Sequence, residues 1–71
     1  MDKELIDLIN TSVEDSTEQA IAADLIQAIT DLGFSLEQAA NLLEAEIKDD
    51  PDAYDFDEDD LETFIYKIET S

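Results

Sequence analysis

The sequence has 71 residues, of which 21 are Asp or Glu and three are Lys, so its net charge is −18. This charge excludes direct binding to nucleic acid and to anionic membranes, since both require cationic side chains. The chain contains no Cys and no His, which removes disulfides, thiolate metal sites and the commonest general base. A chain of this length is expected to form one domain, residues 1–71, with a thin hydrophobic core.

No apolar run is long enough for a membrane span. We also expect no signal peptide, since no basic segment followed by an apolar one opens the sequence. The absence of Cys is compatible with a reducing compartment. We therefore expect a cytoplasmic protein.

The first segment, residues 2–10, is predicted to be a short helix. Asp2 and Glu4 lie at its N-terminus, where the helix dipole favours acids. About nine residues are marginal as an isolated helix, so this one should pack on the rest of the chain. It is expected to end at the Asn-Thr-Ser sequence of residues 10–12. Its apolar face consists of Leu5, Ile6, Leu8 and Ile9.

Residues 16–47 are predicted to form a helical hairpin with its turn at residues 32–35. Each arm carries apolar side chains three and four residues apart, the spacing of one helical face. In the first arm, residues 17–32, these are Ile21, Leu25, Ala28, Ile29 and Leu32. In the second arm, residues 36–47, they are Leu36, Ala39, Ala40, Leu43 and Ile47. Because the first arm is rich in alanine and poor in charge, we expect it to lie centrally.

Local signals mark the ends of the two arms. Gly33 follows the first arm, where a helix C-terminus favours a left-handed residue. Ser35 and Gln38 have the S-x-x-Q spacing of a capping box, and Ser16 and Gln19 repeat that spacing before the first arm. Each arm is therefore predicted to begin at a serine cap.

The segment after the second arm is strongly acidic. Pro51 should end the arm, because the residue before a proline disfavours helix. We expect an acidic loop over residues 49–60, in which Phe56 packs on the core and Tyr54 either packs there or stands exposed as a contact residue.

A last helix is predicted to begin at Asp59 or Asp60, either of which can cap it. Its apolar stripe consists of Leu61, Phe64, Ile65 and Ile68. Together these elements predict an all-α fold, a small bundle of three main helices plus a short N-terminal helix with the hairpin 16–47 at its centre.

Part of the acidic loop matches the beginning of an EF-hand calcium-binding loop. Asp55, Asp57 and Asp59 have the spacing of the first three EF-hand ligands. The match then fails, because Asp60 replaces the glycine of position six and Tyr66 replaces the glutamate of position twelve. We expect a solvated loop, with no metal site and no cofactor. No catalytic residue is predicted. Catalysis by a pair of carboxylates needs a cleft, and a core this small leaves little room for one.

Two short segments resemble known families. Residues 26–39 resemble the first two helices of ubiquitin-associated domains, in which a Met-Gly-Phe type loop binds ubiquitin. This resemblance implies that Leu32, Gly33 and Phe34 contact a partner. Residues 31–36, Asp-Leu-Gly-Phe-Ser-Leu, resemble the Asp-Leu-Gly-x-Asp-Ser-Leu motif of acyl carrier proteins, and this resemblance implies phosphopantetheine attachment at Ser35.

The acidic segment favours a different function, that of a non-enzymatic inhibitor or adaptor bound to a basic, nucleic-acid-binding surface of a partner protein. Duplex DNA carries a charge every ~1.7 Å of its axis, and helical carboxylates four residues apart recur every ~6 Å. Several acidic elements together could therefore replace a phosphate array. This strategy resembles that of phage-encoded DNA mimics, including anti-restriction and anti-CRISPR proteins.

The predicted contact residues are acidic side chains and one aromatic anchor. They are Asp49, Asp50, Asp52, Tyr54, Asp55, Asp57, Glu58, Asp59, Asp60 and Glu62. An interaction domain that uses apolar contacts stays open as the alternative, as does an atypical carrier protein. A homodimer is also compatible with the sequence.

Overall fold

The computed structural model describes residues 3–71, which form four α-helices and one short 3₁₀ helix. No strand occurs in this part of the chain. The predicted all-α bundle with a short N-terminal helix is confirmed. Its elements are α1 (Lys3–Ser12), α2 (Ser16–Leu32), α3 (Leu36–Asp49), η1 (Pro51–Ala53) and α4 (Glu58–Glu69).

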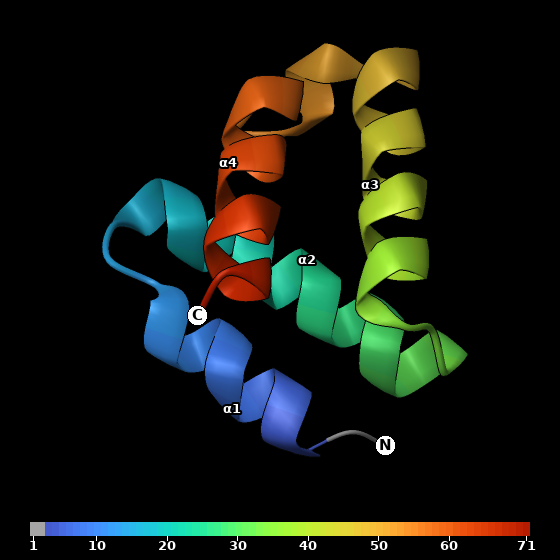
Figure 1. Cartoon of the computed structure of the whole chain (residues 1–71). Helices are drawn as coiled ribbons and strands as arrows, with labels where there is room; N and C mark the ends of the chain where they lie inside the picture. Colours follow the sequence, from blue (N-terminus) through green and yellow to red (C-terminus); the bar gives the residue numbers. More distant parts are fainter. Residues whose placement is uncertain (1–2) are drawn as a thin grey trace.

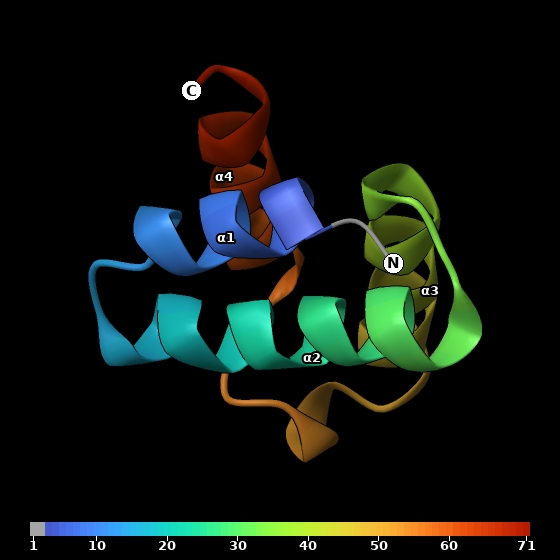
Figure 2. The same ribbon diagram turned by 90° about the horizontal axis from the view of Figure 1, so that it is seen from below.

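The helices form two pairs that cross each other. Helix α1 lies alongside α2, and α3 and α4 stand side by side across this pair (Figures 1 and 2). Helix α2 contacts α1, α3 and α4, so the predicted central position of the first hairpin arm is confirmed. None of the helices between residues 3 and 71 combines the length and the apolar character that crossing a membrane requires.

All four helices contribute to one hydrophobic core. Ile9 of α1, Leu25 of α2 and Phe64 of α4 are completely buried, and Leu43 of α3 is nearly so. The short helix α1 is therefore held by burial of its apolar face against the other helices, as its length requires.

The turn between α2 and α3 has the predicted capping geometry. Gly33 adopts a left-handed conformation with φ 69°. The backbone N–H of Gln38 donates to Oγ of Ser35 at 3.2 Å, and the N–H of Ser35 donates to Oε1 of Gln38 at 3.0 Å. This reciprocal pair is a capping box, which satisfies backbone donors at the start of α3.

The predicted cap of α2 at Ser16 is wrong. Asp15 caps the helix instead, since its Oδ1 accepts a hydrogen bond from the N–H of Glu18 at 2.8 Å. The side chain of Glu18 in turn accepts from the N–H of Glu14 at 2.9 Å. Asp is as good a cap as Ser, and the Asp-x-x-Glu pair lies one residue ahead of the Ser16–Gln19 pair.

The predicted cap of the last helix, Asp59 or Asp60, is also wrong. Asp57 is the cap of α4, and its Oδ1 accepts from the N–H of Asp60 at 2.9 Å. Oδ2 of Asp60 accepts from the N–H of Asp57 at 3.4 Å, which completes a second capping box. Asp60 was expected as a cap and instead occupies the third helical position.

Two other helix ends extend beyond their predicted limits. Helix α1 continues through the expected break at residues 10–12, where the hydroxyls of Thr11 and Ser12 donate to backbone carbonyls one turn earlier. Asp2, the predicted first residue of this helix, lies outside the described residues. Helix α3 runs to Asp49 rather than Ile47, and Pro51 opens η1 directly after the cap residue Asp50.

Candidate functional site

The acidic segment lies at one end of the molecule, where α3 ends and α4 begins (Figure 1). We call this surface the acidic end. Apart from Glu58, which is half-buried, its carboxylate residues are exposed. They are Asp49, Asp50, Asp52, Asp55, Asp57, Glu58, Asp59, Asp60 and Glu62.

The carboxylates of the acidic end differ in how far they are already engaged. Those of Asp57 and Asp60 accept backbone hydrogen bonds in the capping box of α4. Lys48 of α3 forms an ion pair with Glu44 at 3.3 Å. Its pKa is raised, first by the hydrogen bond to Glu44 and then by the charge of Glu58. Among residues 48–62 this lysine is the only cation, so the acidic end keeps a large excess of negative charge.

The two aromatic residues of the acidic segment have different environments. Phe56 is buried in the core, so the prediction that it packs there is confirmed. Tyr54 is half-buried, and its ring packs on that of Phe56 with centroids 5.6 Å apart. Its hydroxyl donates a hydrogen bond to the carboxylate of Glu46 in α3. Tyr54 is thus fixed in place, with its hydroxyl directed toward α3.

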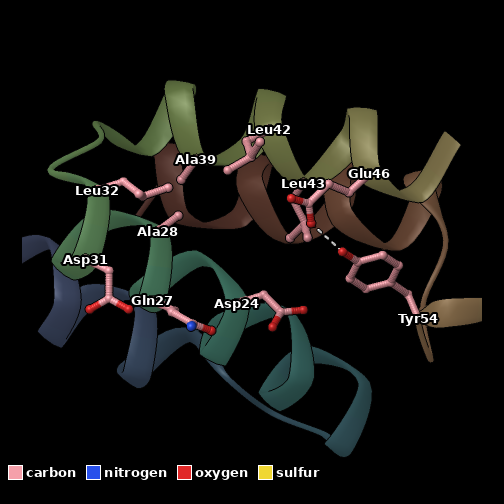
Figure 3. Close-up of a pocket in the computed structure, with 10 residues that line it drawn as sticks. All are labelled: Asp24, Gln27, Ala28, Asp31, Leu32, Ala39, Leu42, Leu43, Glu46 and Tyr54. Carbon is pink, nitrogen blue, oxygen red and sulfur yellow. Dashed lines mark hydrogen bonds between the residues drawn. The ribbon is translucent and has the colours of Figure 1, made fainter. Parts of the chain in front are cut away.

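A groove of about 370 Å³ runs between α2 and α3 from Leu32 to Tyr54 (Figure 3). We call it the α2–α3 groove. Its lining residues lie three and four positions apart on each helix, so each helix presents a single face to it. From α2 these are Asp24, Gln27, Ala28, Asp31 and Leu32, and from α3 they are Ala39, Leu42, Leu43 and Glu46.

The electrostatics of the groove are dominated by carboxylates. The pKa of Asp24 is raised, first by burial and then by the nearby charge of Glu46. The pKa of Tyr54 is raised from 10.0 to about 12, chiefly because its hydroxyl donates to Glu46. The charge of Glu46 contributes to both shifts, after burial in the case of Asp24 and after the hydrogen bond and burial in the case of Tyr54.

The residues singled out by the two family resemblances lie at the turn between α2 and α3. Leu32 is 56% exposed, whereas Phe34 is half-buried against the core. Ser35 is exposed, and its hydroxyl oxygen serves as the cap of α3. Asp55, Asp57 and Asp59, the EF-hand-like triplet, do not converge, and no cluster of three or more potential metal ligands occurs within residues 3–71.

The groove carboxylates Asp24, Asp31 and Glu46 were not predicted as site residues. A signal for them exists in the sequence, because Asp24 and Asp31 are seven residues apart and therefore lie on one face of a helix. What the sequence does not give is the way α3 crosses α2, which brings Glu46 to the opposite wall of the groove.

Comparison of the chain with protein-family models, with curated proteins and with solved structures finds no match. Inference about function therefore depends on the acidic end and the α2–α3 groove themselves.

Proposed function

We propose that this protein is a non-enzymatic acidic inhibitor or adaptor that binds a basic, nucleic-acid-binding surface of a partner protein. One observation carries the proposal: residues 49–62 place nine carboxylates at one end of the molecule, and eight of these residues are exposed. A protein with a net charge of −18 does not gain stability from such a concentration, because like charges repel. A cationic partner would relieve this repulsion.

The arrangement of the acidic end supports mimicry of a nucleic acid backbone. Carboxylates come from the end of α3, from η1 and from the first turns of α4. They thus offer a partner several short rows of charge in place of phosphates. Long-range attraction would make association fast and strongly dependent on salt. Anti-restriction and anti-CRISPR proteins of the DNA-mimic type act by this strategy. We place the activity in the cytoplasm, with which a chain lacking Cys is compatible.

Two matched variants test the proposal. Both lose four exposed carboxylates, so their net charges are equal, and neither touches a capping residue. The test variant removes charge from the acidic end through Asp49→Asn, Asp52→Asn, Asp55→Asn and Asp59→Asn. The control variant removes it elsewhere through Glu4→Gln, Asp7→Asn, Glu37→Gln and Glu69→Gln.

The experiment is affinity capture of proteins from a candidate host lysate, after which bound proteins are eluted with excess duplex DNA or with high salt. The wild type and the control variant should retain a partner that duplex DNA and high salt both release. The test variant should retain about tenfold less of it, since several charged contacts are lost together. If the test variant retained the partner as well as the control did, or if duplex DNA failed to release it, the proposal would be wrong.

A second candidate is an interaction domain that uses apolar contacts at the turn between α2 and α3. The exposure of Leu32 favours it. Because Phe34 packs partly on the core, Phe34→Ala should affect stability under either proposal. Loss of binding by a variant that is still folded would support the turn, whereas full binding would support the acidic end.

A further inference from the structure

The α2–α3 groove combines an apolar floor with acidic walls. Ala28, Ala39 and Leu43 are buried residues of the core that also line the groove. Leu42 is half-buried, and Leu32 is more than half exposed at one end. A large exposed aliphatic side chain beside a hollow marks a surface where another apolar group could be buried with gain.

The walls carry carboxylates that no cation of the groove compensates. Asp24 and Asp31 lie on the α2 side and Glu46 on the α3 side (Figure 3). None of the described residues that line the groove is Lys. The ion pairs of Lys48 and Lys67 are made with other acids, namely Glu44, Glu14 and Glu18. The groove is thus complementary in charge to a basic group.

We propose that the α2–α3 groove seats a peptide segment of a partner protein that presents a lysine or arginine next to an apolar side chain. The apolar group would pack on Leu32 and Leu42, and the cation would lie between the carboxylates of the two walls. Long basic side chains suit this arrangement because they have an apolar stem and a charged head. A volume of about 370 Å³ is at the small end of binding pockets, which suits a few side chains.

Charge decides between this occupant and a second copy of the chain. Each copy carries a net charge of −18, so a dimer formed through this groove would bring carboxylates toward an acidic surface. The proposal goes beyond the proposed function, because it adds an apolar contact on a surface outside the acidic end. Tyr54 links the two surfaces, since it belongs to the acidic segment and also lines the groove.

The first test uses the wild-type chain alone, labelled with nitrogen-15, and three short amidated peptides. The first peptide contains alanine, lysine and leucine, with the leucines at helical spacing. The second replaces the leucines by serine and keeps the charge. The third keeps the leucines and replaces lysine by glutamate. Amide chemical shifts report where each peptide binds.

The lysine–leucine peptide should shift the amide signals of the groove residues, above all Asp24, Leu32, Leu42 and Glu46. The lysine–serine peptide should shift only signals of the acidic end, and the glutamate peptide should shift neither set. If the lysine–leucine peptide gave the same pattern as the lysine–serine peptide, the groove proposal would be wrong while the proposed function could still hold. Groove shifts with the glutamate peptide would also overturn it.

The second test uses variants of Leu32 and Tyr66, two large side chains that are exposed. Leu32→Ser removes the apolar end of the groove. Tyr66→Ser removes a side chain on α4 that is more exposed, at 69%, and does not line the groove. Leu32→Ser should lower the affinity for the lysine–leucine peptide about tenfold, which is the effect expected of a central contact residue. Tyr66→Ser should bind as the wild type does. Equal affinities for all three proteins would contradict the proposal.

A matched pair of charge variants completes the test. Asp31→Asn with Glu46→Gln removes one carboxylate from each wall, and the glutamine can still accept the hydrogen bond from Tyr54. Glu37→Gln with Glu69→Gln removes the same charge outside the groove. Only the first pair should reduce groove shifts with the lysine–leucine peptide, and unchanged groove shifts in that pair would count against the proposal.

Discussion

The hydroxyl of Tyr54 donates a hydrogen bond to the carboxylate of Glu46, and this contact joins the acidic segment to the wall of the α2–α3 groove. The tyrosine ring also packs on Phe56, which is part of the core. The segment between α3 and α4 is therefore fixed at two points. The carboxylates around it are displayed from an ordered backbone rather than from a free tail.

This contact predicts a specific dependence of stability on pH. The pKa of Tyr54 is about 12 in the folded protein, against 10.0 for the free side chain. Between these values the unfolded chain releases the phenolic proton while the folded protein keeps it, so the free energy of unfolding falls as pH rises. In Tyr54→Phe this contribution disappears. Urea unfolding from pH 8 to pH 12 should show a shallower decline for the variant, and identical declines would contradict the role given to the hydrogen bond.

Lys67 connects two helices that are distant in sequence. Its ammonium group lies 3.1 and 3.2 Å from the two carboxylate oxygens of Glu18 and 3.3 Å from Glu14. Burial acts to lower the pKa of Lys67, but the hydrogen bonds and the charges of these two acids together outweigh it, and the pKa is raised.

Lys67→Met should therefore lower the melting temperature more than Lys48→Met does. Both variants lose one positive charge, but Lys48 pairs with Glu44 one turn away on the same helix. The difference between their melting temperatures measures the contribution of the ion pair that joins Lys67 of α4 to Glu18 at the start of α2. Thermal unfolding followed by circular dichroism measures it, and equal losses would mean that only net charge matters.

Gly33 has a left-handed backbone, and a Cβ added there would meet no atom within 4 Å. The cost of Gly33→Ala should therefore come from backbone conformation alone, about 1 kcal/mol of unfolding free energy. Gly33→Asn should lose less, because Asn tolerates this conformation better. Chemical denaturation of the two variants gives the comparison, and an alanine variant as stable as the wild type would contradict the assignment of this turn.

Asp24 is partly buried beside Glu46, and burial is the main reason that its pKa is raised. A carboxyl with a raised pKa destabilises the folded state once it is ionised, so stability due to Asp24 is lost as pH rises above 3.8, the usual value of such a group. Asp24→Asn should be more stable than the wild type at pH 7, within the ~0.5 kcal/mol typical of surface changes. Its advantage should shrink on acidification, and Asp31→Asn provides an exposed control.

Local sequence signals were sufficient for the main elements of the fold. The apolar stripes located α2, α3 and α4, and Gly33 with the Ser35–Gln38 pair located the turn. The caps of α2 and α4 were misplaced because several acids or hydroxyls compete at neighbouring positions. Local chemistry ranks these caps almost equally.

Contacts between distant segments could not be read from the sequence. The ion pair of Lys67 with Glu18 spans 49 positions, and nothing in either local pattern indicates it. The α2–α3 groove likewise exists because α3 crosses α2 and brings Glu46 opposite Asp24. The acidic end was easier to predict, since its carboxylates lie close together in the chain and only their exposure needed the structure.

The most direct test of the central claim, that the acidic end engages a cationic surface, is the affinity for the captured partner as a function of salt concentration. For the wild type, affinity should fall steeply as salt rises, because screening weakens every charged contact. The variant with four Asp→Asn substitutions at the acidic end should show a shallower slope, and the control with four neutralised acids elsewhere should follow the wild type. An affinity that hardly changes with salt, or equal slopes for the two variants, would contradict the claim.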